Sequence, residues 1–205
     1  MKAATLVVFT RYPRPGEAKT RLAPALGLDG AADLARRMLI NTWEVALAAA
    51  RAAACGLELH GCGAGGDEFP ALLGDDVAFF AQSGEEFGER LERAFASAFG
   101  RGAGPVILVG ADCPSLSARH FREALAALEA HDAVLGPARD GGWWLLGLRA
   151  PAPELFHGIA WSTPAVLDQT LAAARSAGLI VALLEELADV DRPEDLALPG
   201  DGPWT

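Results

Sequence analysis

The chain has 205 residues, 51% of them hydrophobic, and a formal net charge of −10. This length suits one compact domain, and the acidic balance argues against a protein that neutralises nucleic-acid phosphates or anionic lipids over a broad surface. The three cysteines, Cys55, Cys62 and Cys113, are odd in number and lack paired spacing, which favours reduced thiols over a disulfide framework.

The N-terminal segment does not look like an export signal. It enters an apolar run after one lysine and has no small-residue cleavage site. No apolar stretch approaches the roughly 20 residues that are needed to cross a bilayer. We therefore expect a cytoplasmic protein with no membrane partner and no nucleic-acid partner, and we predict no particular oligomeric state.

Short β-type runs alternate with stretches of helical length along the chain. The predicted strands are residues 5–9, 57–61, 77–81, 106–110, 133–136 and 179–184. A capping box of Ser83 and Glu86 predicts a helix through Phe99, and Thr163 with Pro164 opens another that Gly178 closes. Continuous apolar runs fit strands that are covered on both faces.

This alternation predicts the α/β class, with one mostly parallel, doubly wound sheet and helices on both faces. No composition break marks a domain boundary. We expect a single domain over residues 1–198 and a loose C-terminal tail over residues 199–205, which contain Pro and Gly.

Ligands of open parallel sheets bind beyond the carboxyl ends of the strands, where loops and helix N-termini meet. Four predicted loops there have unusual chemistry, and a fifth candidate lies near the C-terminus. They are residues 10–22, 82–90, 110–115, 139–144 and 189–195. The functional site should therefore be formed by these segments.

The first loop gathers basic residues in an otherwise acidic chain: Arg11, Arg14, Lys19 and Arg21. Lysine supplies a mobile point charge and arginine a planar fork that suits phosphate oxygens, while Gly16 allows close approach of a ligand to the backbone. A bound diphosphate is the predicted ligand. The alternative is a solvated basic loop that balances neighbouring acids.

Asp112 follows a buried-looking strand, and Pro114 restricts the turn after it. A carboxylate beside a diphosphate is a common ligand of Mg²⁺ or Mn²⁺, so Asp112 is the predicted principal metal ligand, unless it only caps the loop as an Asx turn. Asp191, in a run of acids around Pro193, either completes this metal site or stabilises the start of a short helix.

Residues 139–144 place Asp140 and two glycines, Gly141 and Gly142, before the indoles of Trp143 and Trp144. Paired glycines let a backbone pass close to a flat ligand, and a tryptophan ring can stack on a sugar or base. This loop is a predicted acceptor or sugar pocket, in which Asp140 orients or partly deprotonates the acceptor. In the alternative, it is a turn before a strand and the tryptophans lie in the core.

Five sequence blocks together resemble a bacterial family of glycosyltransferase-like proteins, long known as a domain of unknown function, with members called arsenosugar-type glycosyltransferases. The blocks are Phe-x-Arg-x-Pro-x-Pro-Gly-x-x-Lys-Thr-Arg-Leu-Ala-Pro at 9–24, Gly-Ala-Asp-Cys-Pro-x-Leu at 110–116, Leu-Gly-Pro-x-x-Asp-Gly-Gly at 135–142, Trp-Ser-Thr-Pro at 161–164 and Asp-Val-Asp-x-Pro-Glu-Asp-Leu at 189–196. The resemblance implies a GT-A, Rossmann-like fold of the nucleotide-diphospho-sugar transferase superfamily.

Residues 18–24 are also similar to the lysine segment of phospholactate guanylyltransferases, and more loosely to molybdenum-cofactor guanylyltransferases and sugar nucleotidyltransferases. This similarity implies that Lys19 and Arg21 bind phosphates and that Asp112 binds the metal. Gln82 and Gly88 match positions that contact the base in those enzymes, although Glu85 and Glu86 between them depart from the usual pattern.

The strict Asp-x-Asp of many GT-A glycosyltransferases is missing, because residue 114 is Pro114. Metal binding would then need Asp191 or water. We predict a metal-dependent transferase that moves a sugar from a nucleotide-sugar to a small acceptor, with Lys19, Asp112 and Asp140 as catalytic residues. The alternatives are a nucleotidyltransferase that joins a nucleoside triphosphate to a phosphorylated small molecule, and a non-catalytic nucleotide-binding protein.

Overall fold

A single mixed sheet forms the centre of the computed structural model, which describes residues 2–197. Its seven strands lie in the order β3-β2-β1-β4-β6-β5-β7. They are β1 (Thr5–Arg11), β2 (Gly56–Cys62), β3 (Phe79–Ala81), β4 (Val106–Val109), β5 (Ala133–Pro137), β6 (Trp143–Leu148) and β7 (Val181–Leu183). All are parallel except β6, which pairs antiparallel with both β4 and β5. The predicted mostly parallel sheet is confirmed.

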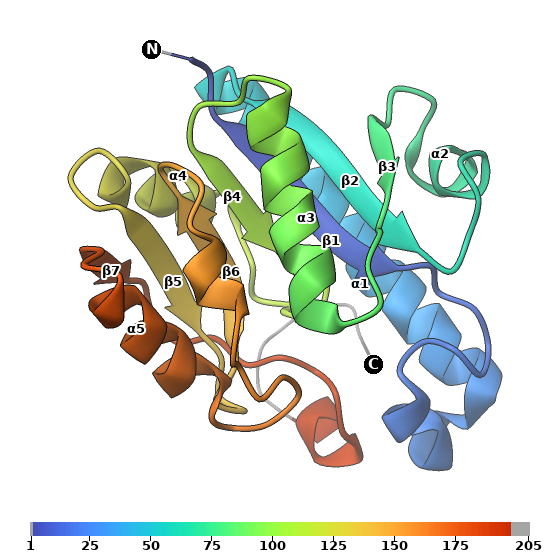
Figure 1. Ribbon diagram of the computed structural model, residues 1–205. Helices are drawn as coiled ribbons and strands as arrows, with labels where there is room; N and C mark the ends of the chain where they lie inside the picture. Colours follow the sequence, from blue (N-terminus) through green and yellow to red (C-terminus); the bar gives the residue numbers. More distant parts are fainter. Residues whose placement is uncertain (1, 198–205) are drawn as a thin grey trace.

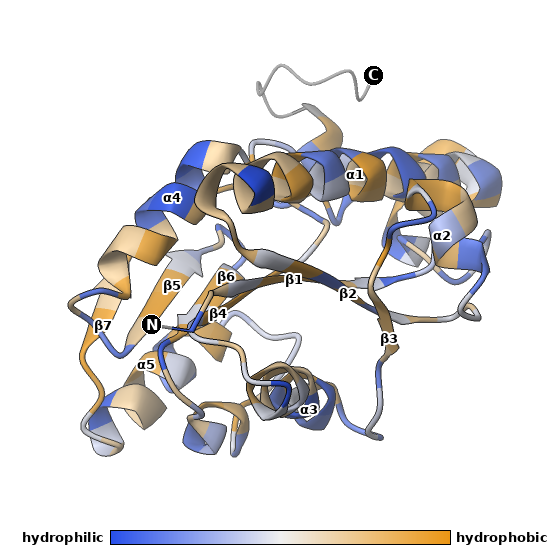
Figure 2. Cartoon of the chain, turned by 90° about the horizontal axis from the view of Figure 1, so that it is seen from above, coloured by the Kyte–Doolittle hydropathy of each residue, from blue (hydrophilic) through white to orange (hydrophobic). Residues whose placement is uncertain are grey.

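Helices cover both faces of this sheet (Figures 1 and 2). On one face lie α1 (Ala23–Ala53), α2 (Glu68–Leu73) and α4 (Ala118–Ala127), and on the other lie α3 (Phe87–Gly100), α5 (Val166–Ser176) and the short 3-10 helix η2 (Pro153–Phe156). Strand β1 is buried on both sides: Leu6 and Val8 pack with α1, while Val7 and Phe9 pack with α3. This explains its continuous apolar sequence.

Strand β6 was not among the predicted strands. It begins directly after a short turn and brings Trp144 into the core, 4% exposed, as the alternative interpretation of that segment proposed. Gly136 on the neighbouring strand leaves room for the indole, because an added Cβ would lie 2.3 Å from the Trp144 ring. Its apolar run is continuous like that of β4, but it follows directly on the loop assigned to an acceptor or sugar pocket, and only the alternative interpretation of that segment contained a strand.

Several boundaries also differ from the predictions, two of them beside the predicted loop 82–90. Helix α3 begins at Phe87, and Ser83 does not cap it; instead the Glu89 carboxylate accepts a hydrogen bond from the Glu85 backbone N–H at 2.8 Å. Strand β3 is shorter than predicted and begins at Phe79. The predicted tail at residues 199–205 lies outside the described residues, and the single-domain extent over 1–198 stays a prediction.

The arrangement of β1, β4 and β5 positions the loops that follow them. These three strands run in the same direction, so their carboxyl ends meet at one edge of the sheet. Antiparallel β6 starts at this same edge, which puts the β5–β6 turn beside the loops after β1 and β4. Among residues 2–197, no helix combines the length and apolar character that crossing a membrane would require.

Candidate functional site

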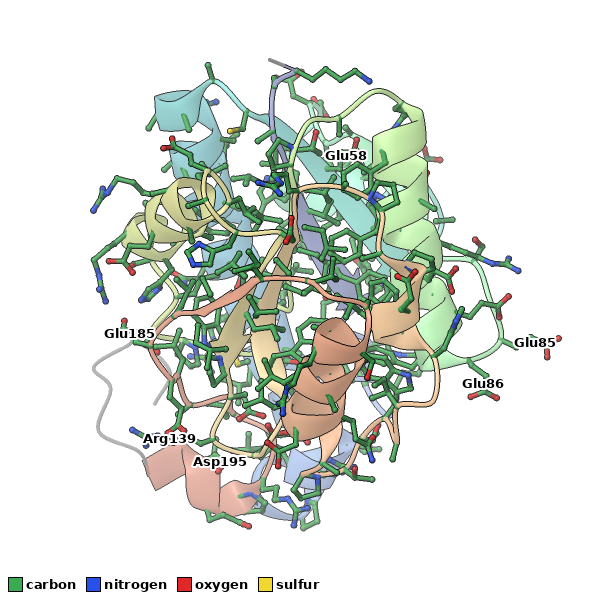
Figure 3. The ribbon with its side chains drawn as sticks, turned by 60° about the vertical axis from the view of Figure 1, so that its left-hand side comes forward. Glu58, Glu85, Glu86, Arg139, Glu185 and Asp195 are labelled. Atoms are coloured by element: carbon green, nitrogen blue, oxygen red, sulfur yellow. The ribbon has the colours of Figure 1, made fainter. Side chains whose placement is uncertain are left out.

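A cleft of about 880 Å³ lies at the carboxyl edge of the sheet. All five predicted loops contribute to its walls, and a sixth segment, residues 161–164, closes one side. Figure 3 shows two of the lining residues, Arg139 and Asp195, toward one end of the molecule, far from Glu58. The volume is within the range of small-molecule sites.

Lys19 lies at the base of the cleft, just before the short 3-10 helix η1 (Thr20–Leu22). Its backbone is left-handed, with φ 49° and ψ 38°, which is uncommon for a residue with a side chain and is often found at functional sites. Its side chain is only 7% exposed, and its Nζ lies 2.7 Å from Asp112 Oδ1 and 3.3 Å from Asp191 Oδ1. Burial alone would lower the pKa of Lys19, but the two carboxylates outweigh it and raise the pKa above its usual value.

Asp112 and Asp191 come from different loops and converge on this ammonium group. Asp112 follows β4 and is 55% exposed, whereas Asp191 precedes the 3-10 helix η3 (Pro193–Ala197) and is 35% exposed. The Asp112 carbonyl accepts a hydrogen bond from the Val190 backbone N–H at 2.9 Å, which ties the two loops together. Arg21 binds the second oxygen of Asp191 at 2.5 Å.

These cations determine the charge state of Asp191. Burial would raise its pKa, but Lys19 and Arg21 more than offset this effect, so the pKa lies below its usual value. Asp189 shows the opposite behaviour: burial and the nearby charge of Asp140 raise its pKa to about 6. The carboxylate of Asp140 also accepts the Gly142 backbone N–H at 2.8 Å, forming a local turn.

The cleft walls carry six basic and seven acidic side chains. They are Arg11, Lys19, Arg21, Arg90, Arg139 and Arg192, and Glu17, Asp112, Asp140, Asp189, Asp191, Glu194 and Asp195. The basic loop is therefore not a free cationic surface, because acids from other segments balance it. A polyphosphate would need an additional cation to enter such a cleft without strong repulsion.

A divalent metal fits this chemistry. No group of three His, Cys, Asp or Glu side chains is arranged to hold a metal within the described part of the chain. Mg²⁺, however, is commonly bound by one or two protein carboxylates together with substrate phosphates and water. Asp112 and Asp191 already converge on one positive charge, so they form a donor pair that suits an ion entering with a phosphate.

The other predicted site residues fall into two groups. Arg11, Arg21, Gln82, Asp140, Gly142 and Trp143 line the cleft with Lys19, Asp112 and Asp191, whereas Arg14, Gly16, Gly88 and Gly141 are not among its lining residues. The Gln82 side chain donates hydrogen bonds to the carbonyls of Thr10, at 2.8 Å, and His60, at 2.9 Å, so its amide nitrogen joins the ends of β1 and β2.

Three of the residues outside the lining have visible structural roles. Arg14 forms an ion pair with Glu68 at 2.5 Å. Gly88 makes room for residues that pack on α3, because an added Cβ would lie 2.3 Å from Trp161 Nε1. Gly141 allows the β5–β6 turn to touch the backbone of Pro164.

Aromatic side chains form one side of the cleft, which we call the aromatic wall: Phe87, Trp143 and Trp161. The Trp161 ring lies edge-on to Phe87 at 5.3 Å and to Trp143 at 6.2 Å, and the Arg90 guanidinium lies 5.8 Å from the Phe87 ring centroid. Trp143 Nε1 and Arg90 Nε are buried and have no hydrogen-bond partner among the described residues. Both groups are donors, so they favour a ligand rich in acceptor atoms.

Sequence reasoning assigned no role to Trp161, Arg90 or Asp189, all of which line the cleft. Trp161 and Asp189 stand in sequence blocks that the resemblance used, and Asp189 also lies in the predicted site segment 189–195. Arg90 ends the predicted site loop 82–90 but lies in the first turns of α3, and its residue type alone did not indicate a role in the cleft.

Comparison with known proteins identifies relatives that match different shares of the chain. The family described as "Uncharacterized protein conserved in bacteria (DUF2064)" matches residues 44–163. A crystal structure from Desulfovibrio desulfuricans G20, provisionally named a nucleotide-diphospho-sugar transferase, is 35% identical with a TM-score of 0.88, and the alignment covers 96% of this chain and 85% of that one.

A curated relative from Phenylobacterium zucineum (strain HLK1) is named 3-phospho-D-glycerate guanylyltransferase. It is 41% identical over 106 residues, which is 48% of this chain and 45% of that protein, so the match spans less than half of the relative. Rv0371C from Mycobacterium tuberculosis H37Rv, solved with manganese, has a TM-score of 0.56 at 17% identity over 94% of this chain and 96% of that one. This last similarity shows a shared fold alone.

Proposed function

We propose, on the premise that the chain belongs to the bacterial family DUF2064, that it is a metal-dependent transferase of the GT-A type that acts on a nucleotide donor. The observation that carries the proposal is the convergence of Asp112 and Asp191 on the buried ammonium group of Lys19. The groups that we propose for phosphate binding and for metal binding thus lie within contact distance in an open cleft. The guanylyltransferase name of one relative and the transferase name of another support the same class.

The residues of the cleft have separate roles in this proposal. Lys19 and Arg21 bind the donor phosphates, and Asp112 and Asp191 hold Mg²⁺ or Mn²⁺. The bound metal would neutralise charge on the departing phosphate group. Asp140 lies beside the aromatic wall and orients the attacking group of the acceptor, whose oxygens would be matched by the donors of Trp143 and Arg90.

Nucleotidyl transfer is the chemistry that we favour first. In this reaction an acceptor oxygen attacks the α-phosphate of a nucleoside triphosphate, a new phosphorus–oxygen bond forms, and pyrophosphate leaves. The two proposed metal ligands, Asp112 and Asp191, come from separate loops, and Pro114 stands where an Asp-x-Asp motif would have its second acid. The name of the Phenylobacterium relative supports the same choice.

Glycosyl transfer from a nucleotide-sugar is the second candidate. There the acceptor oxygen attacks the anomeric carbon and a nucleoside diphosphate leaves, so the same phosphate and metal sites would serve. The name of the Desulfovibrio structure supports this chemistry. The proposed location of either reaction is the cytoplasm.

A product assay separates the candidates. The protein is incubated with Mg²⁺, a panel of phosphorylated acids and sugars, and either nucleoside triphosphates or nucleotide-sugars. Pyrophosphate release that depends on both acceptor and metal supports nucleotidyl transfer, and nucleoside diphosphate release from a nucleotide-sugar supports glycosyl transfer. Tight nucleotide binding without turnover across the panel would instead indicate a non-catalytic binding protein.

Trp143→Phe tests the acceptor side of the cleft. The change keeps an aromatic ring but removes a buried N–H that has no partner among the described residues. We expect the acceptor KM to rise about 2- to 10-fold, the value of one hydrogen bond, with little change in kcat. Trp144→Phe is the matched control, since its indole N–H already bonds the Glu185 carbonyl at 3.3 Å. An equal KM change in both variants would contradict the assignment.

A further inference from the structure

Lys19 occupies the point at which the two proposed metal ligands converge. Its Nζ lies 2.7 Å from one oxygen of Asp112 and 3.3 Å from one oxygen of Asp191. Without a ligand, therefore, the ammonium group supplies the positive charge that these carboxylates require. The same ammonium group is the proposed phosphate ligand, and it cannot fully neutralise these carboxylates and a bound phosphate at the same time.

This arrangement has opposite consequences for each ligand taken alone. A metal ion that binds Asp112 and Asp191 must separate them from Lys19, which leaves a charged group with 7% exposure short of a partner. Such a group is costly to leave unpaired. A phosphate that binds alone must draw Lys19 away from the two carboxylates, which are then left facing the incoming anion. Binding of either ligand therefore lowers the free-energy cost of binding the other.

We propose that Lys19 is an exchange residue: it neutralises Asp112 and Asp191 in the free protein and transfers to the donor phosphates when the metal takes over the carboxylates. Metal and nucleotide then bind tightly only together. This inference rests on the proposed function, because it uses the same metal and phosphate sites. Arg21 contacts the second oxygen of Asp191 through Nη1, so its other N–H groups can bind phosphate while this bond holds the carboxylate in position during the exchange.

The exchange makes a prediction that a simple phosphate-binding lysine would not make: removal of Lys19 strengthens metal binding. Mn²⁺ affinity is measured by electron paramagnetic resonance for the full chain without nucleotide. We expect Lys19→Met to bind Mn²⁺ roughly tenfold more tightly than the wild type, within the usual range of coupled sites. Lys2→Met, which removes the same charge from an exposed position, should leave the affinity unchanged.

The second readout is the coupling between the two ligands. GTP should increase the Mn²⁺ affinity of the wild type, and Mn²⁺ should increase GTP affinity by the same factor, since binding linkage is reciprocal. This factor should fall sharply in Lys19→Met. Lys19→Gln, which can still form hydrogen bonds inside the cleft, provides a second neutral variant if the methionine variant folds poorly, as judged by circular dichroism.

Lysine-selective NMR follows the exchange in the unmutated protein. Lys2 and Lys19 are the only lysines of the chain, so a lysine label gives two assignable signals. These spectra use diamagnetic Mg²⁺ in place of Mn²⁺. The Lys19 signal should shift fully only when Mg²⁺ and GTP are both present. A Lys19 signal that responds equally to GTP alone would overturn the exchange.

The outcomes distinguish this inference from the proposed function. Equal or weaker Mn²⁺ binding by both Lys19 variants overturns the exchange, even if transfer activity is found and depends on metal. Tighter binding that disappears when Asp112→Asn is added supports the exchange. If that pattern is found but no donor is turned over, the exchange stands and the transferase proposal fails.

Discussion

Asp112→Asn is expected to lower kcat/KM for the transfer reaction by about 10² to 10³-fold, the usual loss when one charge-stabilising group is removed from an active site. Asparagine has nearly the same shape but carries no negative charge, so it binds a divalent ion weakly. It also removes the nearer of the two carboxylates that contact Lys19. Steady-state kinetics over a range of Mg²⁺ concentrations measure the effect, and the apparent metal affinity should fall with the rate.

Asp75→Asn is the matched control for this change. Asp75 is exposed and does not line the cleft, so its replacement removes the same charge without touching the site. Its activity and metal dependence should equal those of the wild type. Full activity of Asp112→Asn at low Mg²⁺ would rule out Asp112 as the principal metal ligand.

Gly141→Ala is expected to destabilise the protein by about 2–5 kcal/mol, because overpacking and a strained backbone conformation act at the same position. Its φ is +89°, and an added Cβ would lie 2.3 Å from the Pro164 carbonyl oxygen and 2.7 Å from the Pro164 Cα. Backbone atoms cannot move aside as a flexible side chain can. Thermal unfolding should show a midpoint lower by roughly 5–15 °C for a chain of this size.

Gly158→Ala separates the two causes. Gly158 also has a positive φ, +70°, but an added Cβ there meets nothing within 4 Å. Its cost should therefore be only about 1 kcal/mol from the backbone conformation. Equal losses in the two variants would show that contact with Pro164 is unimportant. Because Asp140 precedes Gly141, we also expect Gly141→Ala to reduce transfer activity of the folded fraction.

Local sequence predicted much of the fold and the location of the site. The strands that flank the cleft, β1 and β4, have apolar runs long enough to be recognised, and their polar loops follow directly. Since parallel strands bring their carboxyl ends to one edge, the predicted segments had to meet there. In the structure, these segments together line the cleft.

Neighbours that are distant in sequence decided the roles of the glycines. Gly88 matched a position that contacts the base in similar enzymes, and Gly141 suggested close approach of a flat ligand, because a glycine in a polar loop often allows it. In the structure, Trp161 and Pro164 are the groups that approach them. A glycine in a loop can indicate that another group packs close to its Cα. The surrounding sequence does not show whether that group belongs to a ligand or to another part of the chain.

The basic loop after β1 also combines properties that local sequence determines with properties that depend on tertiary packing. The sequence by itself determined that Lys19 and Arg21 follow the first strand of an α/β sheet and that Asp112 follows a second strand, since apolar periodicity and residue type are local properties. Only the tertiary structure decided that Asp191, 172 residues from Lys19, joins them and that Lys19 is buried between two carboxylates. Electrostatic balance depends on distances across the fold, and these arise only when separate loops pack together.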